Sequence, residues 1–287
     1  MRLPPEAIKF YEQSGWYISD YVLSDSEIED CIQGAERLYR GDLDARYSWS
    51  SAAILGDTVR TYSDRSRSRV DQFASFHCGP IRRVVHSPVI ACMGAQLLRS
   101  PEVRYYKDIL ISSAAESRES AIGWHLDISY WPTCIPERMI TIYVPLQDRD
   151  VSSGTLLMMT GSQKWVSRHF NLALKFEEVE KLRAKFTAEG HPTELTPLVH
   201  RRGQVSFHSS LVVHSTYPNM TPVFQQAVVF GLQAADNRYV PSPLKRINPR
   251  AVINLNDEIG PKLPDGTPDV KNDEFYPVLY SDPERPL

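Results

Sequence analysis

Hydrophobic residues recur at helical spacing within the first hundred residues. Ile28, Ile32 and Leu38 share one face of a segment that Ser24 and Glu27 begin as a capping box. This pattern predicts an amphipathic helix packed on a core. Two further helices are predicted from proline near the first turn and from apolar spacing, over residues 5–13 and 88–98.

From about Val103 to Gln233 the pattern changes to short apolar runs that turn residues separate. The strand-like runs cover residues 139–145, 153–162, 203–207, 211–214 and 225–233. Many short strands of this kind predict a mainly β fold, with a double-stranded β-helix (a cupin-like jelly roll) flanked by N-terminal helices. Residues 176–186 have helical spacing and mixed charge, and we interpret them as a surface helix inserted into this core.

The last predicted strand has a useful alternation. Gln225, Ala227, Val229 and Gly231 fall on one face, because alternate residues of a strand project to the same side. Three of these four residues are small or short, so we expect this face to leave space for ligands.

Two stretches have no clear period. Residues 41–76 are polar and rich in arginine, which favours a solvated loop, with a lid over a pocket as a second hypothesis. The chain after Val240 is rich in proline, asparagine and aspartate, so we expect an extended tail that packs on the body and is a candidate contact of a homodimer. We therefore predict a single domain over residues 1–287, comprising a helical support with a candidate lid (1–100), a jelly-roll core (101–239) and an extended tail (240–287).

The composition is that of an ordinary globular protein. A chain of 287 residues with 42% hydrophobic residues can bury one sizeable core, and a net charge of −3 does not favour nucleic acid or an anionic membrane. The first residues lack an apolar signal core, and no run is long enough to span a bilayer. Four cysteines without paired spacing favour reduced thiols, so we expect a cytoplasmic location.

One spacing carries candidate chemistry. His125 and Asp127 would project from the same face of a strand, and His214 follows 87 residues later (214 − 127). Two imidazoles and one carboxylate form a facial set with open positions, which suits non-haem Fe(II). The short motif is weak alone, since 8 histidines and 35 acidic residues in 287 give about one such pair by chance (8 × 35/287). Its weight comes from the strand-like context.

Further motifs occur in the order of a known family. They are Phe10–Ser19, Trp124-His-x-Asp-x-x-Tyr-Trp131, Gly154-Thr-Leu followed by Gly161-Ser162, His214-x-Thr-x-x-Asn219 and Leu232–Tyr239. With them the chain resembles the phytanoyl-CoA dioxygenase family of Fe(II)/2-oxoglutarate oxygenases over about residues 7–239. The resemblance implies that His125, Asp127 and His214 bind iron, with Fe(II), 2-oxoglutarate and O2 as the reactive set.

The resemblance also implies roles for residues around the iron. Trp131 and Tyr143 match positions near the cosubstrate or substrate, and Thr216 matches a hydroxyl that helps to hold the cosubstrate carboxylate. His208 lies six residues before His214 on the same face and is a rival ligand, but the motif after His214 favours His214.

At one position the chain departs from the family. An arginine normally follows the second histidine by eleven residues and binds the distal carboxylate of 2-oxoglutarate, but Gln225 stands there. An amide in place of a bidentate guanidinium weakens binding by roughly 1.5–3 kcal/mol, or about ten- to a hundredfold. Another cation could substitute. Strand parity turns Arg138 away, whereas Arg104 and Lys107 remain candidates.

The predicted function is therefore hydroxylation, desaturation or cyclisation of a small organic substrate, with a natural-product intermediate as our interpretation. Asp127 favours oxygenation over halogenation, because related halogenases carry a small residue there. Two alternatives remain because of Gln225: a cupin-type metalloenzyme that does not use 2-oxoglutarate, and a catalytically silent binding protein.

Overall fold

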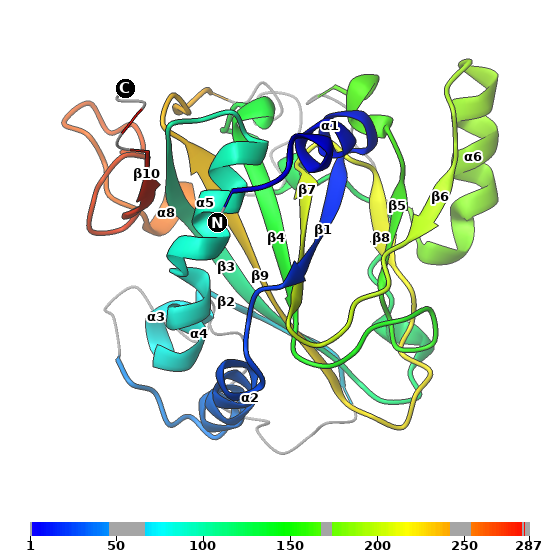
Figure 1. The fold of residues 1–287 in the computed structure, drawn as a ribbon, viewed down its shortest axis with the longest axis horizontal. Helices are drawn as coiled ribbons and strands as arrows, with labels where there is room; N and C mark the ends of the chain where they lie inside the picture. The colour runs from blue at the N-terminus through cyan, green and yellow to red at the C-terminus, as the bar shows by residue number, and fades with distance from the viewer. Residues whose placement is uncertain (1, 46–66, 168–173, 242–253, 283, 285–287) are drawn as a thin grey trace.

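A large antiparallel sheet and a small one face each other in the computed structural model (Figure 1), which describes residues 2–45, 67–167, 174–241, 254–282 and 284. The large sheet has the order β1-β7-β4-β9-β3-β10, and β2 also pairs with β3. Its strands are β1 (Trp16–Tyr21), β2 (Arg69–Gln72), β3 (Glu102–Ser113), β4 (Met139–Pro145), β7 (Gln204–Ser209), β9 (Gln225–Ala234) and β10 (Val278–Ser281).

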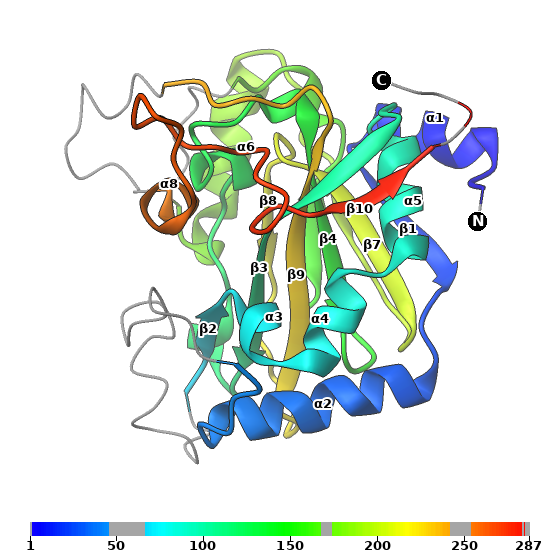
Figure 2. The same cartoon turned by 90° about the vertical axis from the view of Figure 1, so that its left-hand side faces the viewer.

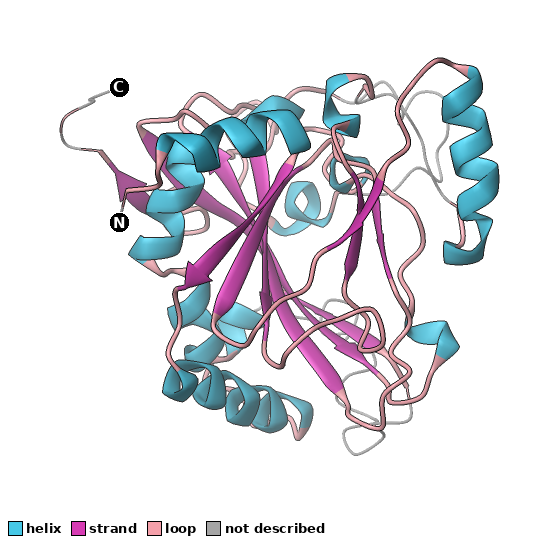
Figure 3. Ribbon diagram, turned by 45° about the vertical axis from the view of Figure 1, so that its right-hand side comes forward, coloured by secondary structure: helices cyan, strands magenta, loops and turns pink. Residues whose placement is uncertain are grey.

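The small sheet has the order β6-β5-β8. Its strands are β5 (Leu156–Met159), β6 (Leu195–Pro197) and β8 (His214–Thr216). A bridge between His125 and His214 adds the segment before Asp127 to its edge. Figure 3 shows the two sheets as separate layers, with α6 (Val179–Ala188) outside the small one. This arrangement confirms the predicted jelly roll and the inserted surface helix.

Helices cover the outer face of the large sheet (Figure 2). They are α1 (Pro5–Ser14), α2 (Asp25–Tyr39), α3 (Ala74–His77), α4 (Gly79–Val85) and α5 (Pro88–Leu97). The three helices predicted from spacing are confirmed: Gly15 ends the first at a φ of 81°, and the Ser24–Glu27 capping box begins the second.

Short one-turn helices occupy several connections. They are η2 (Arg118–Ser120), η3 (Asp127–Ser129), η4 (Pro136–Arg138), η5 (Ser162–Lys164), η6 (Phe176–Glu178) and the α-helix α8 (Leu255–Ile259). The turn η3 starts at Asp127, so the chain leaves the extended conformation at the last residue of the His-x-Asp motif, directly after the extended Leu126.

The alternation predicted for β9 is confirmed. Val228 and Phe230 pack with the outer helices, whereas Ala227 and Val229 line the core between the two sheets. Gly231 lies beneath Trp131, and a Cβ there would approach the indole ring to 3.1 Å. The side chains on the inner face of β9 are therefore small from Ala227 to Gly231, and Trp131 packs on the last of these positions.

The three regions predicted from the sequence (1–100, 101–239 and 240–287) share one sheet and are less separate than expected. β1 and β2 come from the first hundred residues, and β10 from the tail, yet all three join the large sheet. Two of them share one edge, because β10 pairs with residues 102–104 of β3 and β2 pairs with residues 109–112. β10 of the tail is thus a part of the sheet, while most of the proposed lid lies outside the described residues. Within the described residues, no helix has the length and apolarity needed to cross a membrane.

Candidate metal centre

The structure brings the two ends of the predicted motif together. One ligand atom from each of His125, Asp127 and His214 lies within 4.8 Å of the others. Asp127 Oδ1 is 3.6 Å from His125 Nε2 and 3.7 Å from His214 Nε2. These separations leave room for one ion between the three atoms.

Backbone carbonyls fix both imidazoles in the orientation that a metal requires. His125 Nδ1 is 2.8 Å from the Gly123 carbonyl oxygen, and His214 Nδ1 is 3.0 Å from the Val212 carbonyl oxygen. Because a carbonyl only accepts, each Nδ1 donates, which leaves the Nε2 lone pair toward the cluster. The outer hydrogen bonds therefore select the tautomer that can bind a metal.

The charges within the cluster suit the same purpose. Burial, and then the neighbouring His125, lowers the pKa of His214 to about 3, so its imidazole is neutral at pH 7. Burial opposes ionisation of Asp127, but the surrounding histidines, led by His214, hold its pKa well below the usual range. Two imidazole nitrogen donors and one carboxylate fit Fe(II).

The second oxygen of Asp127 is held by groups outside the cluster. Asp127 Oδ2 accepts hydrogen bonds from Thr141 Oγ1 at 2.5 Å and from His208 Nε2 at 2.9 Å. His208 is therefore placed behind the carboxylate rather than among the candidate ligand atoms. Thr141 and His208 pair across β4 and β7, and their convergence on Asp127 was not predicted from the sequence.

The other predicted site residues lie at the inner surfaces of the two sheets. Tyr143 is buried in the core between the sheets, and Trp131 covers Gly231 and makes a T-shaped ring contact with Tyr106. Thr216 Oγ1 accepts a hydrogen bond from the Ile122 amide at 2.8 Å. Its hydroxyl proton therefore remains available for an acceptor such as a carboxylate.

Gln225 and Gln226, at the start of β9, point to opposite faces of the large sheet. Gln226 Nε2 lies 3.3 Å from the Tyr39 hydroxyl on the helical side. Gln225 faces inward with Ala227, and its Oε1 is buried without a hydrogen-bond partner. The chain thus places an amide, with an unused acceptor, where the family places a guanidinium.

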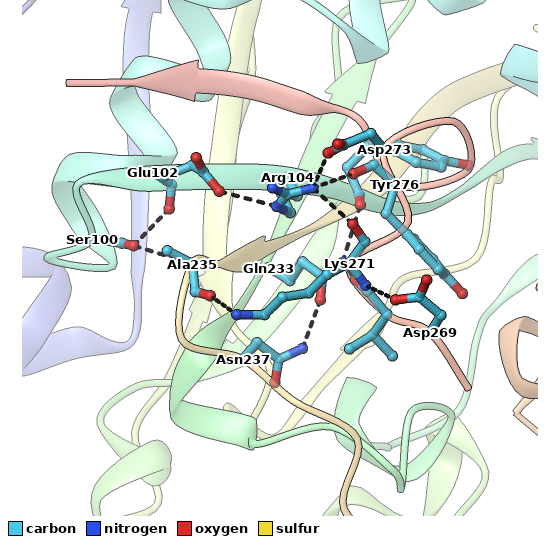
Figure 4. Close-up of polar contacts among 12 residues, drawn as sticks. Ser100, Glu102, Arg104, Gln233, Ala235, Asn237, Asp269, Lys271, Asp273 and Tyr276 are labelled. Atoms are coloured by element: carbon cyan, nitrogen blue, oxygen red, sulfur yellow. Dashed lines mark hydrogen bonds and ion pairs between the residues drawn. The ribbon is translucent and has the colours of Figure 1, made fainter. Parts of the chain in front are cut away.

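The basic residues considered as substitutes for the family arginine lie in different environments. Figure 4 shows Arg104 joined to Glu102 and to the C-terminal segment. Arg104 Nη1 donates to Asp273 at 2.6 Å and lies within reach of the Lys271 and Tyr276 carbonyls, so it fastens the tail and does not face the cosubstrate. This contradicts the cosubstrate role considered for Arg104.

Strand parity was correct for Arg138, whose Nε donates to Asp236. Lys107 pairs with Gly231, and its ammonium lies 5.7 Å from the centre of the Phe73 ring. Burial lowers the pKa of Lys107 to about 8, although Asp108 opposes this shift. Its place on β3 is level with the candidate iron ligands, because Gly231 also pairs with Thr141.

Comparison with known proteins supports this architecture. The family model described as phytanoyl-CoA dioxygenase matches residues 11–227. No curated protein sequence matches the chain.

Solved structures share the fold at low identity. The carbocyclase SnoK of nogalamycin biosynthesis has a TM-score of 0.69 at 18% identity, covering 96% of both chains. The epimerase SnoN, solved with Fe3+, alpha-ketoglutarate and nogalamycin RO, gives 0.68 at 19% identity, covering 96% of this chain and 98% of SnoN. EctD from S. alaskensis, with 2-oxoglutarate and 5-hydroxyectoine, gives 0.63 at 18% identity, covering 83% of this chain and 78% of EctD. At these identities the likeness establishes the shared fold.

Proposed function

The chain belongs to the phytanoyl-CoA dioxygenase family of Fe(II)/2-oxoglutarate-dependent oxygenases, and from this premise we propose that it oxidises a small organic substrate. The cluster of His125, Asp127 and His214 carries the proposal, because three ligand atoms within 4.8 Å form the facial donor set of such enzymes. Bound Fe(II) would supply the coupling of 2-oxoglutarate decarboxylation to substrate oxidation by O2, with succinate and CO2 as coproducts.

The protein's own residues would hold and orient the reactants. Thr141 and His208 hold Asp127 from behind, and the Gly123 and Val212 carbonyls hold the two imidazoles. The Thr216 hydroxyl offers a donor to a carboxylate, and Trp131 closes the inner face at Gly231. Such fixed groups keep the reacting partners aligned and water excluded.

For the substrate, we propose a natural-product intermediate or another small polar molecule. SnoK and SnoN belong to nogalamycin biosynthesis, and EctD was solved with 5-hydroxyectoine. The named reactions of these proteins include carbocyclisation and epimerisation, so hydroxylation, desaturation and cyclisation all stay within the proposal. The retained Asp127 favours these oxidations over halogenation.

A cupin-type metalloenzyme that works without 2-oxoglutarate is the second candidate, because Gln225 removes the family arginine. A silent binding protein is less favoured, because the three donors and their supporting hydrogen bonds are all present.

Succinate release tests the proposal. The protein is loaded with Fe(II) without oxygen, mixed with 2-oxoglutarate and then exposed to air. We expect succinate from the wild type and from a His191→Ala control, and none from His214→Ala. If the wild type yields no succinate and binds no 2-oxoglutarate at millimolar concentration, the 2-oxoglutarate assignment is wrong and the second candidate replaces it.

A further inference from the structure

We propose that Arg149 binds the distal carboxylate of the 2-oxo acid and thereby replaces the arginine whose position Gln225 occupies. This inference rests on the proposed function, since it concerns the same cosubstrate. It assigns the missing cation to the connection between β4 and β5 instead of the family position on β9.

Arg149 is a buried cation without a counterion. Arg149 is 2% exposed. Its Nη1 donates a hydrogen bond to the Ser153 carbonyl oxygen at 2.6 Å, and its Nε is buried without a hydrogen-bond partner. The flanking carboxylates are engaged elsewhere: Asp148 pairs with Arg201, and Asp150 accepts hydrogen bonds from the turn that follows it. Among the described residues, no acidic side chain pairs with Arg149.

A buried guanidinium of this kind is unfavourable unless an anion compensates it. Burial lowers the pKa of Arg149, which expresses the same unfavourable solvation. A bound carboxylate would supply both the missing charge and the acceptor for the unused Nε–H. The structure therefore contains one half of a charge pair whose other half is absent from the described chain.

The guanidinium lies close to the backbone that follows Thr216, the residue with the predicted carboxylate-binding hydroxyl. Gly154 has a φ of +84°, and a Cβ built there would lie 3.4 Å from Arg149 Nη1 and 3.2 Å from the Tyr217 carbonyl oxygen. The absent side chain thus lets Arg149 approach the backbone next to Thr216. The free proton of the Thr216 hydroxyl and the guanidinium can then serve the same carboxylate.

Strand β4 gives the order of the groups along the cavity. Thr141 contacts Asp127 at the metal position, and Tyr143 follows about 7 Å further along the same face. Arg149 lies near Tyr143, because it pairs with His200, whose ring centre is 5.4 Å from that of Tyr143. Burial raises the pKa of the Tyr143 phenol, and the nearby Arg149 charge partly opposes the rise. A five-carbon diacid with its oxo-acid end at the metal would extend in this direction, toward Tyr143 and Arg149.

Lys107 is the competing cation, but its position is different. It is level with Gly231 and Thr141, beside the metal position rather than beyond it. From there its ammonium would meet the substrate or the metal-binding end of the oxo acid. The two cations therefore give distinct expectations for binding of the distal carboxylate.

The test compares 2-oxoglutarate with 2-oxopentanoate, which has the same carbon chain without the distal carboxylate. Calorimetry on the Ni(II)-loaded, full-length protein measures binding without turnover. We expect the wild type to prefer 2-oxoglutarate by about ten- to a hundredfold, the range of one charge-assisted pair. Arg149→Met should abolish this preference and leave 2-oxopentanoate binding unchanged, whereas Lys107→Met should retain the preference.

A rescue variant separates loss of the charge from loss of the fold. Arg149→Met combined with Gln225→Arg restores a guanidinium at the family position, so we expect the preference to return. A preference that survives Arg149→Met, or that Lys107→Met abolishes, overturns the assignment and leaves the proposed function intact. Equal wild-type affinity for the two acids also overturns it, whereas binding of neither acid contradicts the proposed cosubstrate as well.

Discussion

His208 donates a hydrogen bond from Nε2 to Asp127 Oδ2 across 2.9 Å, while Asp127 Oδ1 faces the two other candidate ligands. One carboxylate therefore divides its oxygens between a supporting histidine and the metal position. We expect His208→Phe to lower Fe(II) affinity about ten- to a hundredfold, the usual effect of removing such an outer partner. Competition with a chelator measures the change.

The matched control is His191→Phe, since the His191 ring stacks on Trp165 at 4.3 Å outside the cluster. Equal metal affinity in His208→Phe and in this control would contradict an orienting role for His208.

Gly123 links the backbone of the site to a neighbouring segment. Its carbonyl accepts from His125 Nδ1, and a Cβ at Gly123 would come within 2.4 Å of the Leu174 carbonyl oxygen. Because that contact is with backbone, Gly123→Ala must displace the segment that carries His125. We expect a loss of about 1–3 kcal/mol in unfolding free energy, together with weaker metal binding. Chemical denaturation and metal titration measure the two effects.

Gly190→Asn is the control for Gly123, because Gly190 has open space around it and a positive φ that asparagine tolerates. Metal binding in this control should match the wild type. A Gly123→Ala protein with wild-type stability and affinity would show that the segment adapts without moving His125.

Burial of Lys107 should make the free energy of unfolding depend on pH. Its folded pKa of about 8 lies below the ordinary value of 10.5, so between these pH values the unfolded state binds more protons. Stability should therefore rise with pH across this window. Lys107→Met should be most stabilising below pH 8, with a benefit that shrinks toward pH 10.5 by on the order of 1 kcal/mol per pH unit.

Denaturant midpoints of the wild type and Lys107→Met at several pH values measure this difference. A benefit of Lys107→Met that is constant from pH 7 to 10 would place the Lys107 pKa at its ordinary value.

Arg104 should contribute to stability and not to cosubstrate binding. Arg104→Gln removes the charge-assisted contact with Asp273 and leaves carbonyls of the tail without their donor (Figure 4). We expect the free energy of unfolding to fall by about 1–3 kcal/mol and the tail to be cleaved faster by proteases. Limited proteolysis and thermal unfolding measure both, and 2-oxoglutarate affinity should stay at the wild-type value.

Arg99→Gln provides the comparison for Arg104, since the Arg99 side chain is 62% exposed and pairs with Glu12 at the surface. Arg99→Gln should change the free energy of unfolding by no more than about 0.5 kcal/mol. An Arg104→Gln protein as stable as Arg99→Gln would contradict the fastening role.

Local sequence patterns were sufficient for four of the helices, for most strands of the core and for the metal cluster, but not for β2, α3, α4 or β10. The capping box, the helical spacing and the alternation of β9 each depend on neighbouring residues, so the sequence predicted them directly. The His-x-Asp motif and the distant His214 were found because strand parity and the order of motifs constrain them together. In contrast, Thr141 and His208 met at Asp127 through the register of β4 with β7, which no local pattern determines.

Arg149 shows the same limit more sharply. Its sequence neighbours suggest an exposed turn, with Asp148 and Asp150 on either side and serines after it. Its burial follows from the backbone pairing of Arg149 with His200, fifty-one residues away (200 − 149). The signal for such a residue is a charge without a partner in three dimensions, and sequence spacing does not contain it.

The outer edge of β3 has a consequence for how the chain behaves in a crowded solution. A strand of 12 residues with open amide and carbonyl groups would be a template for pairing with another molecule. Here β2 and β10, drawn from distant parts of the chain, occupy separate halves of that edge. Removal of β10 would thus uncover the half beside Glu102 and Arg104, and the first sign of damage would be self-association through that edge rather than loss of the metal cluster.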